Sequence, residues 1–228
     1  MKDPLLEISE KYKDRKIVIA WPSHELIDYR FAHSLIELVV QNASLFSLGL
    51  ANSISSRVAV NRNGCVEKAR QLEATDILWI DADTKFPVNG LLRLIMHNKD
   101  IVGATTRRRD NRGFPVGLTV DPQATGKMVE MKLIGFPFML TKMSVFDKLE
   151  KPYFAEPPRH MLPEMNCADD ELVGEDEYFC HYARKAGFSI WCDAELSMEI
   201  GHVGSDVKYI EQQYSAPLPP AQPLDATL

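Results

Sequence analysis

Short apolar runs and longer amphipathic segments alternate along the first half of the chain. The runs are rich in Ile, Val, Leu and Trp, as buried parallel strands are, whereas the longer segments repeat apolar residues at helical spacing. The pattern predicts strands over residues 16–21, 77–80 and 100–105 and helices over residues 29–46, 63–74 and 88–98. Repeated strand–helix units predict an α/β fold, Rossmann-like, with a mostly parallel central sheet covered by helices on both faces.

The pattern changes in the second half. Two apolar segments on either side of a Pro/Gly turn indicate antiparallel strands, and therefore a mixed C-terminal extension of the sheet. Residues 152–170 hold several prolines and acids without an apolar period, so we expect a long loop of the kind that binds or covers ligands. The remaining predictions are strands over residues 116–120, 128–142, 188–192 and 196–200 and a helix over residues 175–186.

Length and composition predict one globular domain over residues 16–210. A short N-terminal extension, 1–15, precedes it, and a Pro-rich tail, 211–228, follows it and is expected to be disordered. The 45% of hydrophobic and 25% of charged residues are typical of a soluble domain. A formal net charge of −6 argues against general nucleic-acid binding, although a local basic patch is compatible with it.

Location is predicted from what the chain contains and lacks. No stretch reaches the ~20 apolar residues of a membrane span, and the N-terminus has no apolar signal-peptide core. The cysteines are widely spaced and form no C-x-x-C pair, so we interpret them as reduced structural thiols in a cytoplasmic protein. They are Cys65, Cys167, Cys180 and Cys192.

Two acids, Asp81 and Asp83, directly follow the apolar run 77–80. Open α/β sheets bind their ligands beyond the carboxyl ends of parallel strands, so both carboxylates are expected at a binding site. Their oxygens suit Mg²⁺ or Mn²⁺, and these ions usually complete their coordination with substrate phosphates. The first hypothesis is a divalent cation that holds a diphosphate. A polar turn after a strand is the alternative, since an isolated D-x-D pattern is common.

Three further features lie elsewhere in the chain. Gly174 precedes three consecutive acids at the start of a predicted helix, where the helix dipole favours acids in any case. His202 lies between two glycines after a predicted strand, and with aspartates it can complete a metal site or have a structural role. Residues 57–63 form a basic segment that leads into a helix, which suits an anion or a nucleotide base as well as a plain exposed loop.

The order of these features resembles the GT-A fold glycosyltransferases. A first strand, an Arg/Asn segment, a strand-end D-x-D, a Gly-Glu-Asp helix start and a late His appear in that order over residues 16–204. The resemblance is strongest to bacterial and phage-encoded enzymes of the family-2-like inverting group. It implies transfer of a sugar, with UDP as the expected nucleotide, from a nucleoside-diphosphate sugar to the hydroxyl of a glycan or another acceptor. Retention of configuration and a non-catalytic nucleotide-sugar-binding relative remain alternatives.

The resemblance also implies roles for individual residues. Asp81 matches the acid that contacts ribose beside the metal, and Asp83 and His202 match ligands of Mn²⁺ or Mg²⁺. Asp176 is expected to be the general base, with Glu175 positioning the acceptor, although the sequence leaves the reverse assignment open. The residues expected on the nucleotide-sugar side are Pro22, Ser23, Arg57, Arg62 and Asn63.

A basic cluster follows the predicted strand 100–105. A solvated loop is its simplest interpretation, and we expect only Arg107, the member close to the strand end, to reach the donor.

Two other enzyme classes fit the sequence less well. A sugar-nucleotide pyrophosphorylase needs a Gly-rich, Lys-containing phosphate loop near the first strand, and the chain has none there. An Asp-dependent phosphatase needs Thr four positions after its first Asp, where this chain has Lys85.

Overall fold

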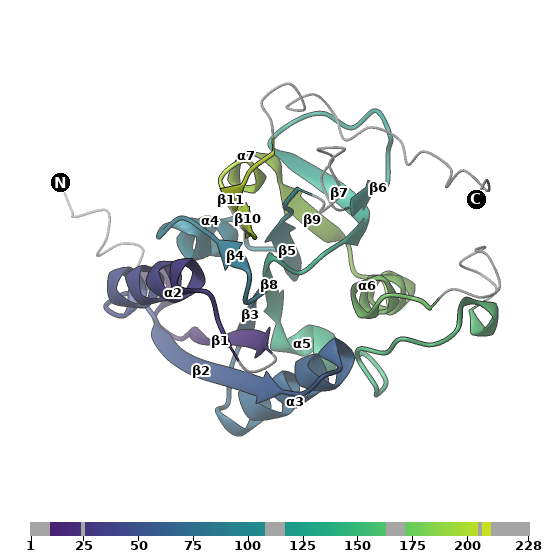
Figure 1. The fold of residues 1–228 in the computed structure, drawn as a ribbon, viewed down its shortest axis with the longest axis horizontal. Helices are drawn as coiled ribbons and strands as arrows, with labels where there is room; N and C mark the ends of the chain where they lie inside the picture. The colour runs from purple at the N-terminus through teal and green to yellow at the C-terminus, as the bar shows by residue number, and fades with distance from the viewer. Residues whose placement is uncertain (1–9, 24–25, 108–116, 163–171, 205–206, 211–228) are drawn as a thin grey trace.

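The computed structural model describes residues 10–23, 26–107, 117–162, 172–204 and 207–210, and it shows an α/β protein built on a large central sheet (Figure 1). The strands are β1 (Lys16–Ser23), β2 (Ser47–Ile54), β3 (Asp76–Ile80), β4 (Thr84–Lys85), β5 (Ile101–Ala104), β6 (Gly117–Thr119), β7 (Met128–Ile134), β8 (Phe138–Lys142), β9 (Ile190–Asp193), β10 (Gly201–Val203) and β11 (Val207–Lys208). The helices are α2 (Tyr29–Asn42), α3 (Val58–Gln71), α4 (Gly90–His97), α5 (Met143–Phe146), the 3₁₀ turn η1 (Arg159–Met161), α6 (Glu175–Lys185) and α7 (Ala194–Ser197).

The central sheet has the strand order β2-β1-β3-β8-β5-β9-β7-β6 among the described residues. The pairings place β2, β1, β3, β5, β9 and β6 in one direction and β8 and β7 in the other. The predicted α/β class is therefore confirmed, with a mostly parallel central sheet and a mixed extension formed by the later strands. A second sheet joins β11, β10 and β4.

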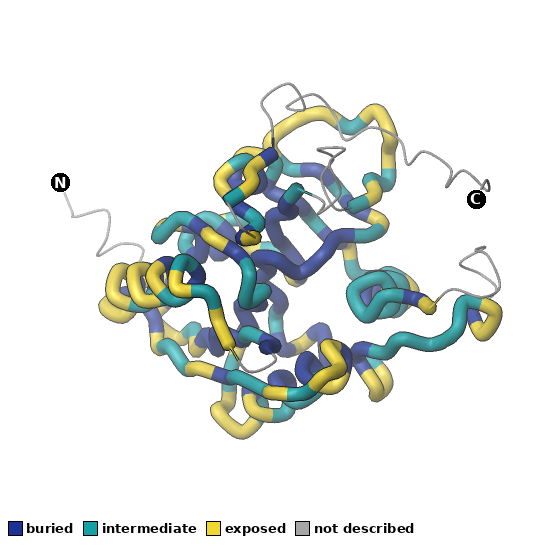
Figure 2. The backbone as a smooth tube through the Cα atoms, in the orientation of Figure 1, coloured by how far each residue is buried: buried dark blue, intermediate teal, exposed yellow. Residues whose placement is uncertain are grey.

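Alternating side chains of the central strands enter two separate cores. In β3, Ile77 and Trp79 pack on the face covered by α3, α5 and α6, and Leu78 and Ile80 pack on the face covered by α2, α4 and α7. Figure 1 shows the two groups of helices on opposite sides of the sheet, and Figure 2 shows the buried strands between them. All five residues of β3 are buried, which confirms the strand predicted from its apolar run.

Three differences from the predicted elements have local causes. Strand β2 was not predicted, because it is an edge strand whose small and polar residues form no apolar run. Helix α3 begins at Val58, five residues before the predicted start, because its first turns bury the polar Asn61 and Arg62 against the sheet. The strand predicted over residues 196–200 is wrong, because residues 194–197 form α7, and the next strand, β10, begins at Gly201.

The N-terminal residues that the structure describes pack onto the domain. Tyr12 is buried in the core beneath α2, and Arg15 pairs through two hydrogen bonds with the buried carboxylate of Asp76. The predicted tail over residues 211–228 and most of the predicted loop over residues 152–170, from residue 163 onward, lie outside the described residues. In the described part of the chain, no helix combines the length and the apolar character that crossing a membrane requires.

Candidate functional site

The two acids of the D-x-D lie at the carboxyl end of β3. The backbone N–H of Asp81 donates to the carbonyl of Pro137 (3.3 Å), because β8 runs antiparallel beside β3 and its first residue pairs with Ile80. The N–H of Thr84 donates to the carbonyl of Asp81 (3.1 Å) and closes a turn around Asp83. This backbone geometry brings both carboxylates to the edge of the sheet where the sequence predicts a binding site.

A pocket of about 200 Å³ opens at this edge. Its walls come from the ends of β3 and β5, from β4 and β10, from the turn between β7 and β8, and from the N-terminal parts of α3 and α6. The lining residues are Arg62, Asp81, Asp83, Thr84, Thr106, Arg107, Gly135, Phe136, Pro137, Glu175, Asp176 and His202. The fold thus brings acidic side chains, arginines and a histidine together in one small volume, although Arg62 and His202 are 140 positions apart in the sequence.

Arg62 is the buried centre of the site. Its Nη2 donates to Asp81 Oδ1 (2.9 Å) and its Nε donates to Glu175 Oε1 (3.2 Å), while only 3% of its side chain is exposed. Burial disfavours the charge on Arg62, but the surrounding carboxylates Asp81, Glu175 and Asp176 outweigh it and raise the pKa of the guanidinium. Arg62 therefore stays charged and joins the D-x-D to the Glu-Asp pair.

Aromatic rings enclose the other faces of Arg62. Its guanidinium carbon lies 4.7 Å from the ring centroid of Phe136, 5.8 Å from that of Trp79 and 5.9 Å from that of Phe154. These contacts favour a cation electrostatically and remove water from the ion pairs. Within the described residues, the buried Nη1 of Arg62 has no hydrogen-bond partner. A buried unpaired donor is costly, so this atom is suited to a ligand oxygen.

Asp83 and His202 are in direct contact. His202 Nε2 lies 3.1 Å from Asp83 Oδ2, and its Nδ1 lies 3.2 Å from the backbone carbonyl of Arg107. A carbonyl oxygen only accepts hydrogen bonds, so Nδ1 carries a proton and donates it. The lone pair of Nε2 in the neutral ring then faces a carboxylate oxygen. The contact is satisfied when Nε2 carries a proton and donates it to the carboxylate, or when a metal ion binds both atoms.

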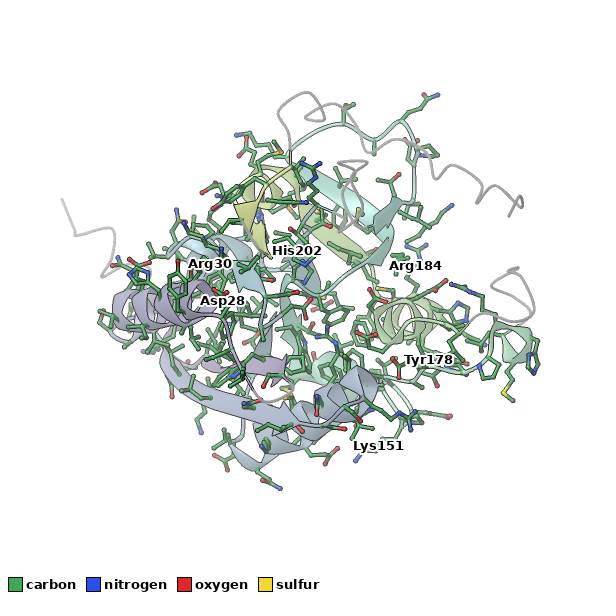
Figure 3. All side chains as sticks on the ribbon, in the orientation of Figure 1. Asp28, Arg30, Lys151, Tyr178, Arg184 and His202 are labelled. Carbon is green, nitrogen blue, oxygen red and sulfur yellow. The ribbon has the colours of Figure 1, made fainter. Side chains whose placement is uncertain are left out.

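The backbone holds His202 against the D-x-D. Strand β10 pairs with β4, with His202 opposite Thr84, and the N–H of Val203 donates to the carbonyl of Asp83 (2.7 Å). His202 therefore lies within a strand rather than after one, which corrects the prediction. Figure 3 labels His202, which projects from the small sheet toward the centre of the molecule.

The Glu-Asp pair forms the first turn of α6, after Gly174 at the N-cap. Asp176 Oδ1 accepts a hydrogen bond from the N–H of Glu177 (2.7 Å). Burial and the negative charge of Glu175 raise the pKa of Asp176 from 3.8 to about 6. The third acid, Glu177, forms a bidentate pair with Arg159 (2.8 and 2.9 Å), so it anchors η1 to the helix and does not line the pocket.

Asp81 shares this electrostatic environment. Burial raises the pKa of its carboxyl from 3.8 to about 6, the cation of Arg62 opposes this shift, and the anion of Asp83 adds to it. Two carboxyl groups of the pocket, those of Asp81 and Asp176, thus take up a proton close to neutral pH. Groups of this kind are concentrated at functional sites.

The remaining residues predicted on the nucleotide side do not line this pocket. Pro22 and Ser23 are buried at the end of β1, where Ser23 Oγ donates to Asn52 Oδ1 (3.2 Å). Arg57 is exposed at the N-cap of α3. The amide of Asn63 donates to the carbonyls of Ala59 and Phe154 and accepts from the N–H groups of residues 153 and 154. Its observed contacts are structural, and its predicted contact with a nucleotide stays a prediction.

Two threonines of the pocket lining have no distinguishing signal in the sequence. Thr84 and Thr106 follow strands and look like ordinary turn residues, yet both are buried against the pocket. Residues 135–137 form its wall because β8 folds back beside β3, and a contact between segments so distant in sequence has no local pattern. Only the short Gly-Phe-Pro sequence, which interrupts two strands, marks the turn.

The predicted metal site stays a prediction, although two of its residues are in contact. The described residues hold no group of three or more His, Cys, Asp or Glu side chains arranged to bind a metal ion. Asp83 and His202 are in contact, but Asp81 directs its Oδ1 to Arg62. The Asp83–His202 pair nevertheless fits a divalent cation. At metal–ligand distances of about 2.1 Å, two ligands at a right angle lie roughly 3 Å apart, as these two atoms do.

Comparisons with known proteins identify the fold and not a family. The sequence matches no protein-family model and no curated protein. The fold resembles that of A197 from STIV, with a TM-score of 0.60 and 15% identity over 93% of this chain and 98% of that chain. Identity this low shows a shared fold alone.

Two other solved structures are more distant. UDP-glucose pyrophosphorylase complexed with UDP-glucose has a TM-score of 0.46 and 8% identity, covering 78% of this chain and 90% of that chain. A glycosyltransferase involved in the glycosylation of the major capsid of PBCV-1 has a TM-score of 0.36 and 11% identity, covering 78% of this chain and 93% of that chain. Scores at this level assign no function to the chain, so the function has to be inferred from the pocket.

Proposed function

We propose that this protein is a metal-dependent glycosyltransferase, which transfers a sugar from a nucleoside-diphosphate sugar to an acceptor hydroxyl with inversion. One observation carries the proposal: the D-x-D, the Glu-Asp pair and the late His, which are far apart in sequence, line a single pocket. The motif order resembles that of GT-A enzymes, and the pocket holds candidate residues for the two functions that sugar transfer needs. These are a cation for the leaving diphosphate and a base for the attacking hydroxyl.

Asp83 and His202 would hold the cation, Mn²⁺ or Mg²⁺. Bound there, the ion would neutralise the charge that develops on the departing diphosphate. His202 is already oriented for this role, because the carbonyl of Arg107 holds the proton on Nδ1 and leaves Nε2 toward Asp83. Asp81 remains beside the donor nucleotide, with its position set by Arg62.

Asp176 would act as the general base. With a pKa of about 6, its carboxylate is mostly unprotonated at pH 7 and still basic enough to accept a proton from the acceptor hydroxyl. The hydroxyl oxygen then attacks the anomeric carbon as the bond from that carbon to the diphosphate breaks. Glu175, held by Arg62, would position the acceptor. Attack from the side opposite to the leaving group inverts the configuration.

The nucleotide side of the proposal rests on position and on resemblance. Arg62 offers its unpaired Nη1, and Arg107 lines the pocket next to the Asp83–His202 pair. Pro22, Ser23, Arg57 and Asn63 remain assigned to the nucleoside by resemblance alone, and UDP remains the expected nucleotide. The buried thiols of Cys65, Cys180 and Cys192 are unpaired, which suits a reducing compartment, so we place the reaction in the cytoplasm.

The test is release of nucleoside diphosphate from a panel of UDP-, GDP- and dTDP-sugars with Mn²⁺, followed for the wild type and for Asp83→Ala. We expect slow hydrolysis of one donor by the wild type and its loss in the variant. The control is Asp121→Ala, which removes an exposed carboxylate that does not line the pocket and should behave as wild type.

The other outcomes distinguish the alternatives. Pyrophosphate as the product would indicate a pyrophosphorylase. Donor binding without turnover, even over a broad set of acceptors, would indicate a binding protein. Retained anomeric configuration in the product, read by NMR, would replace inversion with retention. If the wild type neither binds nor cleaves any of these nucleotides in the presence of Mn²⁺, the glycosyltransferase proposal is wrong.

A further inference from the structure

Lys208 lies in one row with two residues of the pocket. In the small sheet, His202 of β10 is directly opposite Thr84 of β4 on one side and Lys208 of β11 on the other. Directly opposed residues of antiparallel strands point to the same face of a sheet, with their Cβ atoms roughly 5 Å apart. Thr84 and His202 both line the pocket. The register therefore places the side chain of Lys208 on the pocket face, next to His202.

The packing of the opposite face confirms this orientation. A Cβ atom added at Gly201 would lie 2.5 Å from Cγ1 of Val207 and 2.8 Å from the ring of Tyr209. Val207 and Tyr209, the neighbours of Lys208, thus fill the face that Gly201 shares with Val203. Because side chains alternate along a strand, Lys208 points to the other face, that of His202.

A contact at the N-terminus of α2 holds the start of the hairpin between β10 and β11. Arg30 Nη2 donates to the carbonyl of Gly204 (2.8 Å), and Arg30 is itself held by Asp28 through two hydrogen bonds of 2.8 Å. Figure 3 shows Asp28 and Arg30 side by side near the strand that carries His202. The hairpin is therefore anchored where it leaves the pocket.

The charges of the pocket call for a further cation. Its ionisable lining comprises the acids Asp81, Asp83, Glu175 and Asp176 and the cations Arg62 and Arg107. Arg62 is already paired with two of the acids. The proposed divalent cation would balance the two negative charges that remain on the lining, so the charges of an entering diphosphate would still lack a counterpart. Lys208 is exposed. Within the described part of the chain, its side chain forms no ion pair and donates no hydrogen bond.

We propose that Lys208 binds the diphosphate of the donor at the mouth of the pocket, on the side of His202. This inference rests on the proposed function, since it assigns a residue to the same donor site. Lysine suits the role, because its ammonium group is a compact charge on a flexible stem that can follow a phosphate oxygen while staying hydrated. Lys208 supplies positive charge that does not depend on the metal.

The experiment measures binding of inorganic pyrophosphate and of UDP, each with Mn²⁺, by calorimetry. The proteins are the wild type, Lys208→Ala, Lys208→Arg and Lys85→Ala. Lys85 is the matched control, because it is an exposed lysine of the same sheet that lies opposite Gly201, on the face away from the pocket. Uridine, which carries no phosphate, is the control ligand.

We expect Lys208→Ala to weaken pyrophosphate and UDP binding about tenfold, as the loss of one charge-assisted hydrogen bond does. Lys208→Arg should retain most of the affinity, Lys85→Ala should equal the wild type, and uridine binding should not change with any variant. Equal pyrophosphate affinity of Lys208→Ala and wild type would overturn the assignment of Lys208 and leave the proposed function intact. Absence of pyrophosphate and UDP binding in the wild type itself would overturn both.

Discussion

Adjacent acids in the first turn of α6 have different partners, and this difference separates their roles. Glu175 accepts a hydrogen bond from Arg62, whereas Asp176, within the described part of the chain, accepts one from the backbone N–H of Glu177. Burial raises the pKa of Asp176 to about 6. A carboxyl group with such a pKa is well suited to remove a proton from a hydroxyl near neutral pH, whereas an acid tied to a cation is better suited to hold a substrate.

The first prediction concerns the pH dependence of this group. The active form of Asp176 is the carboxylate, so kcat/KM should be constant above its pKa and fall tenfold per pH unit below about pH 6. Asp176→Asn should lower kcat by about 10²–10⁴-fold and remove the contribution of Asp176 to this acidic limb, leaving only that of Asp81 in the residual activity. The measurement is a pH profile of nucleoside diphosphate release with acceptor. Glu177→Gln, the neighbouring acid that pairs with Arg159, is the control and should keep the limb.

At the same scale, local sequence signals mark the acids that come together in the pocket, whereas they do not reveal the contacts that Asn63 makes within the fold. Asp81, Asp83, Asp176 and His202 carry local signals, such as a strand end, a helix start and flanking glycines, and the structure brings them into one pocket. Asn63 has the same kind of local signal, but its amide bonds to the backbone of residues 153 and 154, about 90 positions away. Nothing in the neighbourhood of Asn63 indicates that its hydrogen-bonding capacity is used within the fold.

Among the elements, α7 is a short spacer that sets the position of β10. Ser197 Oγ accepts from the N–H of Thr105 (3.0 Å), and the carbonyl of Ile200 accepts from Thr106 Oγ1 (3.4 Å). These bonds tie the chain before His202 to the end of β5. The helix itself depends on Asp193, whose carboxylate caps it through the N–H of Leu196 (2.7 Å).

We predict that Asp193→Ala lowers the free energy of unfolding by about 2–3 kcal/mol. Roughly 1 kcal/mol comes from the lost cap, and the remainder comes from His97 and Arg93, which lose their shared buried partner. Urea denaturation measures the effect. Glu195→Ala, an exposed substitution on the same helix, should change stability by less than about 0.5 kcal/mol. Equal stability of Asp193→Ala and wild type would show that α7 does not need this cap.

The wrong prediction of a strand over residues 196–200 is explained by the shortness of α7 and by its dependence on a capping residue. Residues 196–200 alternate in a way that is compatible with a strand, and a four-residue helix is too short to show a 3.6-residue period. The start signals were nonetheless present, with Asp193 at the N-cap and Glu195 in the first turn. For elements this short, capping residues are more informative than hydrophobic spacing. The longer α4 and α6 begin and end within two residues of their predicted limits.

Across the whole molecule, contacts between α3 and α6 join the two halves of the chain beside the pocket. Arg62 of α3 reaches Glu175 of α6, and α6 also contacts the segment after α5, where the ring of Phe154 stacks on that of Phe179 with centroids 5.1 Å apart. Figure 1 shows α3 and α6 next to the sheet, with α5 between them in the view. Such long-range contacts have no counterpart in local sequence patterns, which explains why the fold class was predictable and the walls of the pocket were not.

We predict that Arg62→Met lowers the free energy of unfolding by about 2–3 kcal/mol, because it leaves the partly buried carboxylates of Asp81 and Glu175 without the buried cation that pairs with both. For a domain of this size, that corresponds to a Tm lower by roughly 2–4 °C for each kcal/mol. Thermal unfolding at pH 7 is the measurement. Arg57→Ala, at the exposed N-cap of the same helix, is the control and should leave Tm nearly unchanged.

Strand β2 has a consequence for how the protein behaves at high concentration. It is an edge strand of eight residues, paired with β1 in regular register and without a single charged side chain. Leu50 and Ile54 are largely exposed on it. An edge of this kind can add a strand from another molecule, and charged residues or bulges normally prevent this. In the absence of such residues on β2, repulsion between molecules that each carry a formal charge of −6 is what opposes this pairing. Solubility should therefore be lowest near the pI of 5.6, where that repulsion vanishes.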